Sequence, residues 1–194
     1  MLGKYNLQNL KMIESASPSM YSYRNDNTIH IIVYAYSLQG IQCIASLSLE
    51  QQNNGHYRNT GFSGSYYGFG ELLYTMAFVE LEKINKSLIP DDRGLSELAS
   101  KFYTKLDNSN NISVTQFDHL KIYNKNISEE DIFIYNQLTN SHVDNNLTTQ
   151  ELDLILDQAY DLGEYMLPEN NIIDRNQLFN DFKNGYPQFK IKKI

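Results

Sequence analysis

The sequence has few of the residues that build covalent links or metal centres. Cys43 is the only cysteine among 194 residues, so no disulfide can form within the chain. Its apolar neighbours predict a buried strand position, and a single cysteine suits a reducing compartment. The four histidines are widely separated and no cysteine pair accompanies them, so zinc has no ligand set at a recognisable spacing. We therefore expect a protein without a bound metal.

Long apolar runs and an excess of basic residues are also missing. The longest apolar run, Ile29–Tyr36, is interrupted by His30 and is far too short to span a bilayer. The first six residues lack an apolar signal region, so we do not expect secretion by a signal peptide. Sixteen basic against 23 acidic residues give a net charge of −7, and no local basic patch offsets it. Nucleic acid and membranes are therefore not expected as partners.

Two common nucleotide-binding fingerprints are incomplete. The pair Gly68-x-Gly70 lacks the third glycine of a dinucleotide motif, because Leu73 occupies that position. No glycine loop is followed by Gly-Lys-Ser or Gly-Lys-Thr, which a P-loop requires. The sequence therefore excludes both of these sites.

A chain of this length predicts one domain, and its 41% hydrophobic content is enough for a core. Thr28–Tyr36 is dense in β-branched and aromatic residues, and Ile41–Glu50 alternates in polarity. The short link between the two segments predicts an antiparallel hairpin. Ahead of it, the polar stretch up to Asn27 predicts a short helix that covers the sheet.

A glycine-rich loop and a helix follow this hairpin. Four glycines between Gly61 and Gly70 end where an apolar pattern of helical spacing begins. The inward face is predicted to hold Leu72, Leu73, Met76, Ala77, Val79, Leu81 and Ile84. The first amides of a helix lack partners and the helix dipole is positive there, so an anion such as a pyrophosphate is the natural ligand.

The remaining segments complete an α/β order. The expected elements are an extended piece at Lys86–Pro90, a helix capped by Ser96, a strand at Ile112–Phe117, and helices beginning at Ser128 and Thr148. Beyond about Asp118 the composition becomes more polar and acidic. We therefore expect a core over residues 1–120 and a helical or irregular C-terminal extension over 121–194, packed on the same domain.

Three of these features resemble the central motifs of the GCN5-related N-acetyltransferase (GNAT) superfamily, whose members bind acyl-coenzyme A. They are the hairpin, the Tyr67-Gly-Phe-Gly-Glu-Leu-Leu-Tyr74 segment, and Ser96-x-x-Ala99-x-x-Phe102-Tyr103. Together with Asp92-Arg93 they are similar to short, bacteriophage-encoded members. The resemblance covers roughly residues 28–120. It implies a GNAT-like central mixed, mostly antiparallel sheet with flanking helices.

The resemblance also implies roles for particular residues. The pyrophosphate of acetyl-coenzyme A would lie on the backbone amides of Gly68, Phe69, Gly70 and Glu71, with Ser96 also at the cofactor. A backbone N–H near Leu49 would polarise the thioester oxygen. Tyr103 would be the acid that protonates the leaving thiolate, and Glu50 and His56 are the candidates for the base.

Each of these residues also has an ordinary structural interpretation. Glycines at positions 68 and 70 suit close packing of a strand against a helix. Tyr103 suits a core position with its hydroxyl at the rim. Glu50 suits the surface end of a strand, and His56 suits a solvated loop.

Two departures from the family pattern leave two functions open. Ser65 replaces the usual Gln or Arg, and Leu106 runs into Asp107 where the family has a glycine turn. The first hypothesis is a phage-encoded N-acyltransferase that modifies a protein or a small amine in the host cytoplasm. The second is an inactive scaffold, either a virion component or a host-directed inhibitor, that uses a tyrosine-rich, acidic surface. A homo-oligomer is compatible with both.

Overall fold

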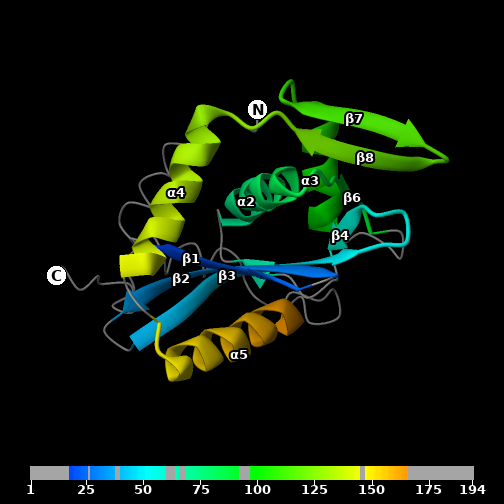
Figure 1. Cartoon of the computed structure of the whole chain (residues 1–194). Coiled ribbons are helices and arrows are strands. Elements are labelled where there is room, and N and C mark those ends of the chain that lie inside the picture. The colour runs from blue at the N-terminus through cyan, green and yellow to red at the C-terminus, as the bar shows by residue number, and fades with distance from the viewer. Residues whose placement is uncertain are drawn as a thin grey trace.

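A mixed, mostly antiparallel sheet of eight strands forms the middle layer of the computed structural model (Figure 1). The structure describes residues 18–25, 27–37, 40–59, 64–65, 69–91, 97–144 and 147–165. The strands are β1 (Ser19–Arg24), β2 (Thr28–Ser37), β3 (Gly40–Gln51), β4 (Tyr57–Asn59), β5 (Gly64–Ser65), β6 (Leu88–Ile89), β7 (Ile112–Phe117) and β8 (Leu120–Lys125). Their order is β1-β2-β3-β4-β6-β8-β7, with β5 alongside β3.

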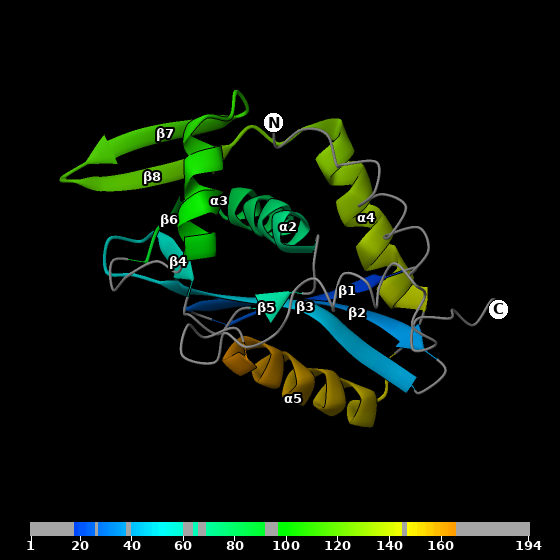
Figure 2. The same ribbon diagram turned by 180° about the vertical axis from the view of Figure 1, so that it is seen from behind.

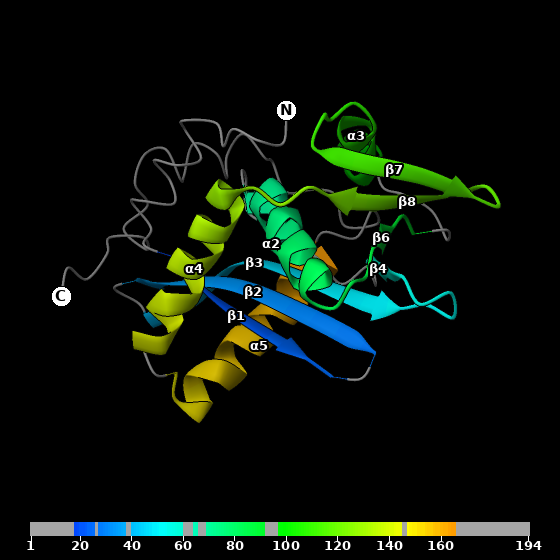
Figure 3. The ribbon, with the colours of Figure 1, turned by 45° about the horizontal axis from the view of Figure 1, so that its top comes forward.

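Helices cover both faces of this sheet. Their bounds are α2 (Phe69–Lys83), α3 (Glu97–Asp107), α4 (Glu129–Asp144) and α5 (Thr149–Tyr165). Figures 1 and 2 show α5 on one face, and α2 and α4 on the other. Figure 3 shows α3 beside the β7–β8 hairpin. The expected mixed α/β architecture with a mostly antiparallel sheet and flanking helices is confirmed.

The β2–β3 hairpin is the centre of the hydrophobic core, as the sequence predicts. Its register runs from Thr28 opposite Glu50 to Ser37 opposite Gly40. Ile29 and Ile31 pack with α2, whereas Ile32 belongs to a second cluster on the α5 face. Both faces of β2 are therefore buried, which explains why the sequence of this strand is nearly continuously apolar.

One pair of neighbouring strands is parallel in an otherwise antiparallel sheet. In the pairing of β4 with β6, Tyr57 lies opposite Leu88 and Arg58 opposite Ile89. The amide of Tyr57 also donates to the carbonyl of Ser87 at 2.9 Å. Parallel neighbours need a crossover connection, and here α2 supplies it. The crossover fixes α2 over this part of the sheet, with its first turn towards the carboxyl ends of β4 and β6.

α5 fills a gap along the edge of β3. The pairings with β4 and β5 involve Leu49–Gln51 and Ala45–Ser46 of β3, but not the segment around Cys43. There the amide of Cys43 donates to Gln158 Oε1 at 2.7 Å, and Gln158 Nε2 donates to the carbonyl of Ile41 at 3.4 Å. The side-chain amide thus takes the place of a neighbouring strand's peptide group.

Capping boxes start α4 and α5 at the positions expected from the sequence. Ser128 Oγ accepts from the amide of Asp131, and the Asp131 carboxylate accepts from the amide and hydroxyl of Ser128. Thr148 and Glu151 form the same reciprocal arrangement. Each box satisfies amide groups that the first turn leaves without a helical partner.

The structure corrects the sequence reading in several places. β1 occupies Ser19–Arg24, within the stretch for which a short helix was expected, and residues 1–17 lie outside the described chain. β4 and β8 were not predicted, because β4 is only three residues long and β8 is polar. The expected boundary near residue 120 falls inside the β7–β8 hairpin, and β8 joins β6 within the same sheet. None of the helices in the described ranges combines the length and apolar character needed to cross a bilayer.

A buried ion pair joins the sheet to α4. Lys125 Nζ bonds to the Asp131 carboxylate, and the two side chains are 1% and 4% exposed. Lys121 and Asp107 form a comparable pair at 2.6 Å, but these side chains are 45% and 31% exposed. The two pairs provide a matched comparison of burial.

We expect Lys125→Met to destabilise the fold by about 3–5 kcal/mol, because it leaves the Asp131 carboxylate buried without its cation. Lys121→Met should cost less than about 1 kcal/mol, because solvent screens the exposed pair. Urea unfolding of both variants measures the difference. Equal costs for the two variants would contradict a structural role for the buried pair.

Candidate functional site at the ends of the parallel strands

Polar and aromatic side chains meet where β4 and β6 end. Asn59 is the last residue of β4, and Pro90 follows β6 directly. Proline carries no N–H, so β6 cannot donate to a neighbouring strand at that residue. The parallel pairing is therefore confined to Tyr57–Arg58 and Leu88–Ile89. Carboxyl ends of parallel strands are common places for ligand sites.

A tyrosine cluster lies at this end of the strands; we use this name for Asn59, Tyr74, Phe102, Tyr103 and Tyr123. Asn59 Nδ2 donates to the hydroxyl of Tyr74 at 3.1 Å. The hydroxyl of Tyr103 donates to the carbonyl of Ile89 at 3.4 Å. It also interacts with the hydroxyl of Tyr74. Tyr74 and Phe102 stack with ring centroids 4.0 Å apart, and the Tyr103 and Tyr123 centroids are 5.3 Å apart. The cluster thereby links β4, β6, α2, α3 and β8.

Burial controls the protonation of these phenols. It raises the pKa of Tyr103 well above its ordinary value, and the neighbouring Tyr74 and Tyr123 add to the effect. Burial also raises the pKa of Tyr74. Desolvation disfavours the phenolate, so both hydroxyls keep their protons at neutral pH. They can donate hydrogen bonds to an anionic atom but do not act as bases there.

Asp107 supports the cluster from the surface of α3. Its carboxylate accepts from the hydroxyl of Tyr123 at 2.9 Å and from Lys121 Nζ at 2.6 Å. Burial alone would raise the pKa of Asp107, but the hydrogen bonds from Lys121 and Tyr123 lower it below its ordinary value. The carboxylate consequently holds the Tyr123 ring in place beside Tyr103.

The first turn of α2 lies near the same strand ends. Among the described residues, none accepts a hydrogen bond from the amides of Phe69 or Gly70. The Glu71 side chain forms an ion pair with Lys105 of α3. This pair places one negative and one positive side chain beside the positive end of the helix dipole. Of the predicted cofactor residues, Gly68 and Ser96 lie outside the described ranges.

The other predicted residues lie further along the strands. Leu49 is buried in β3, where it pairs with Ile29 on one side and Asn59 on the other. The strand that leads into the glycine loop is β4, one strand beyond Leu49. Glu50 lies opposite Arg58, and His56 precedes β4 at its amino-terminal end. Tyr103 lies at the carboxyl end, so the structure groups it with α2 and not with the two candidate bases.

Cys43 is buried, as expected, and burial raises the pKa of its thiol to about 12. A thiol in this state is a poor nucleophile. The described residues also hold no group of three or more His, Cys, Asp or Glu side chains arranged to bind a metal ion.

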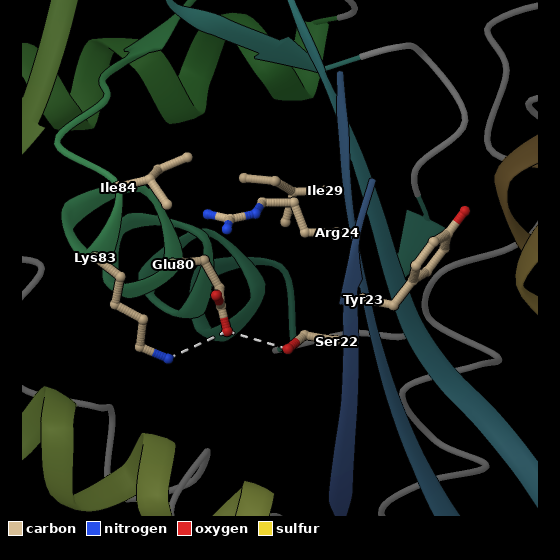
Figure 4. A pocket seen from close by; sticks show the side chains of 7 residues that line it. All are labelled: Ser22, Tyr23, Arg24, Ile29, Glu80, Lys83 and Ile84. Carbon is tan, nitrogen blue, oxygen red and sulfur yellow. Dashed lines mark hydrogen bonds and ion pairs between the residues drawn. The ribbon is translucent and has the colours of Figure 1, made fainter. Parts of the chain in front are cut away.

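A pocket of about 340 Å³ lies away from the tyrosine cluster, between the end of β1 and the last turns of α2 (Figure 4). Glu80 at its wall accepts from Ser22 Oγ at 3.0 Å and from Lys83 Nζ at 3.4 Å. Tyr135 of α4 donates to the same carboxylate oxygen. Because these three donors converge on Glu80, we interpret this wall as a joint between β1, α2 and α4.

Sequence reasoning identified Tyr103 but missed Asn59 and Tyr74 as its neighbours. Tyr74 lies within the motif that ends in Leu-Leu-Tyr, and that position was a usable signal. Asn59 carried none, because β4 is too short to show a pattern.

Comparison with known proteins gives no assignment: no family model, no curated protein and no solved structure matches this chain.

We expect the folded protein to ionise its tyrosines incompletely in alkaline solution. Among the tyrosines whose side chains the structure describes, burial raises the pKa of six: Tyr34, Tyr36, Tyr74, Tyr103, Tyr123 and Tyr135. The stability that their protonated forms contribute is fully present below the unfolded pKa of about 10, and is lost as the pH rises through the folded values. Tyrosinate absorbance of native and denatured protein measures the difference, and Tyr103→Phe should reduce the late phase. Coincident titration curves would contradict the buried cluster.

Proposed function

We propose that this protein is an acyl-coenzyme-A-dependent N-acyltransferase on a GNAT-like scaffold, with acetyl-coenzyme A as co-substrate and an amine of a protein or small molecule as acceptor. The observation that carries the proposal is the parallel β4–β6 pair, joined through the glycine-rich segment and α2. The thioester of acetyl-coenzyme A needs space beside the main chain of a strand, and its diphosphate needs an anion site next to that space. The short pairing of β4 with β6 and the adjacent first turn of α2 support both.

The cofactor's diphosphate would lie on the amides at the start of α2. Phe69 and Gly70 supply main-chain donors, and the absence of a Cβ at Gly70 allows close approach. Glu71 carries a negative charge at the start of α2, and the ion pair with Lys105 offsets that charge. Lys105 is exposed on α3 and can also approach a phosphate oxygen.

Acyl transfer would then proceed at the tyrosine cluster. The amine nitrogen attacks the thioester carbonyl carbon, the C–S bond breaks, and the acyl group passes to nitrogen. The Tyr103 hydroxyl, which holds its proton at neutral pH, donates it to the departing thiolate. The proton lost by the amine passes to solvent, because Glu50 and His56, the two bases expected from the sequence, do not lie with Tyr103. The phenolate of Tyr103 regains a proton from solvent before the next cycle.

One observation favours the alternative of an inactive scaffold with a binding role. Tyr103 is only 5% exposed, and the carbonyl of Ile89 already accepts from its hydroxyl. Catalysis would require the cluster to open around the thiolate. A protein that had lost catalysis could keep the same arrangement as a core, and would act on a virion or host protein through its surface.

Calorimetry with acetyl-coenzyme A tests the proposed function. We expect binding that weakens at least about tenfold in Gly68→Glu and Gly70→Glu, because a carboxylate then competes with the diphosphate. Asn136→Glu, at an exposed position of α4, adds the same charge elsewhere and should bind as the wild type does. Tyr103→Phe should retain binding and lower the turnover of an amine acceptor by about 10²–10⁴-fold.

Pantetheine, which lacks the diphosphate, is the matched ligand control and should bind far more weakly. Equal binding of both ligands, or no heat with acetyl-coenzyme A, would exclude the cofactor role. Binding of acetyl-coenzyme A with no turnover of any amine would favour the inactive scaffold.

A further inference from the structure

β7 forms one edge of the sheet, and in the part of the chain that the structure describes it pairs with β8 alone. At the opposite edge, β1 ends in Arg24 and packs against α4. β7 has the sequence Ile-Ser-Val-Thr-Gln-Phe, without charge, proline or glycine. Five of its six side chains are exposed, among them Phe117 at 68% and Val114 at 38%. Soluble proteins usually protect such an edge with charges, prolines or bulges.

The hairpin turn determines which amides of β7 face outward. Asp118 and His119 both have positive φ, 45° and 69°, and Phe117 lies opposite Leu120. This is a two-residue type I′ hairpin, in which the pair that flanks the turn is hydrogen-bonded. Antiparallel pairs alternate, so Ser113, Thr115 and Phe117 bond to β8. The main-chain groups of Val114 and Gln116 therefore point away from it.

The other side of the hairpin supports this alternation. Tyr123 lies opposite Val114, and it is at Tyr123 that β8 pairs with Leu88 of β6. The amide of Asn126 also donates to the carbonyl of Asn111 at 2.8 Å, one step beyond the pair Ile112–Lys125. Asn111, Ser113 and Thr115 therefore have their main chain towards β8, and that of Val114 points away from it. The amides of Val114 and Gln116 have no acceptor among the described residues.

We propose that β7 pairs antiparallel with β7 of a second copy of this chain, which joins the two sheets edge to edge across a two-fold axis. With the axis at Val114, the main chain of Val114 bonds reciprocally to Val114 of the second copy. The amide of Gln116 donates to the carbonyl of Ile112 of that copy. The amide of Ile112 is already used, because it donates to the carbonyl of Ser109 within its own chain.

The side chains in this register are compatible with one another. Val114 lies against Val114, and Ser113 against Thr115, so no like charges oppose one another. The hairpin over residues 112–125 contains one acid, Asp118, and two lysines, Lys121 and Lys125. The overall charge of −7 is therefore not concentrated at this edge. A foreign strand would be selected by charges or pockets beside the edge, and β7 itself carries no charge, which favours the symmetric partner.

Sedimentation equilibrium of the full chain tests the pairing. We expect the average mass to rise from 22.5 kDa towards twice that value with concentration, in the micromolar to millimolar range typical of a small interface. Gln116→Pro removes an outward amide and leaves the ladder to β8 intact, so it should raise the dissociation constant at least about tenfold. Gln116→Ala keeps the amide and should dimerise as the wild type does.

A second pair of variants compares a charge placed at the two-fold axis with the same charge placed elsewhere on the surface. Val114→Lys places two lysines together at the axis and should abolish the dimer. Ile132→Lys, at a position of α4 with similar exposure (41% against 38% for Val114), should leave it unchanged. Circular dichroism checks that all four variants are folded.

Amide exchange identifies the surface directly. The Val114 and Gln116 amides should become protected as the concentration rises, whereas those of Ser113 and Thr115 should be protected throughout. A monomer at all concentrations, a dimer that withstands Val114→Lys, or constant protection of Val114 would each overturn the proposal, the last by indicating that a segment of the same chain covers the edge.

Discussion

The parallel contact between β4 and β6 is the constraint on which the rest of this structure depends. Two parallel neighbours cannot be joined by a tight turn, so the chain must leave the sheet, cross one face and return. α2 is that crossing segment, and this explains why fifteen residues form a largely buried helix between two very short strands. α3 then packs beside α2, which brings Tyr74 and Phe102 into a stacked pair.

The same constraint places unlike chemical groups together. A helix that returns over its own strand has its first turn near the carboxyl end of that strand. The helix amides that have no acceptor among the described residues, the end of the short β4–β6 pairing and the phenols of two helices therefore share one region. None of these features alone would distinguish a ligand site from ordinary packing. Their combination supports the acyltransferase proposal, and the low exposure of Tyr103 is the feature that the alternative explains better.

Some elements were predictable because their signals are local. The hairpin over residues 28–50 alternates and is rich in β-branched residues, and Ser128 and Thr148 each begin a capping box that forms as expected. β1 and β8 pair with the strands next to them in the chain, but polar residues interrupt their patterns. β4 is only three residues long, and its parallel partner Leu88 lies 31 positions after Tyr57. Asn59 could not be recognised as a neighbour of Tyr103 for the same reason. Single-sequence patterns do not contain such pairings, whereas the helix motif that holds Tyr74 and the motif that holds Tyr103 were visible.

Gln158 has a consequence for how the chain reaches this structure. Its bonds to Cys43 and Ile41 connect residues more than one hundred positions apart, and they complete a stretch of β3 with which neither β4 nor β5 pairs. During synthesis the central hairpin emerges long before α5, so this stretch stays uncovered until most of the chain has left the ribosome. α5 therefore acts late, because its Gln158 is the group that satisfies the main chain of β3 at Cys43 and Ile41.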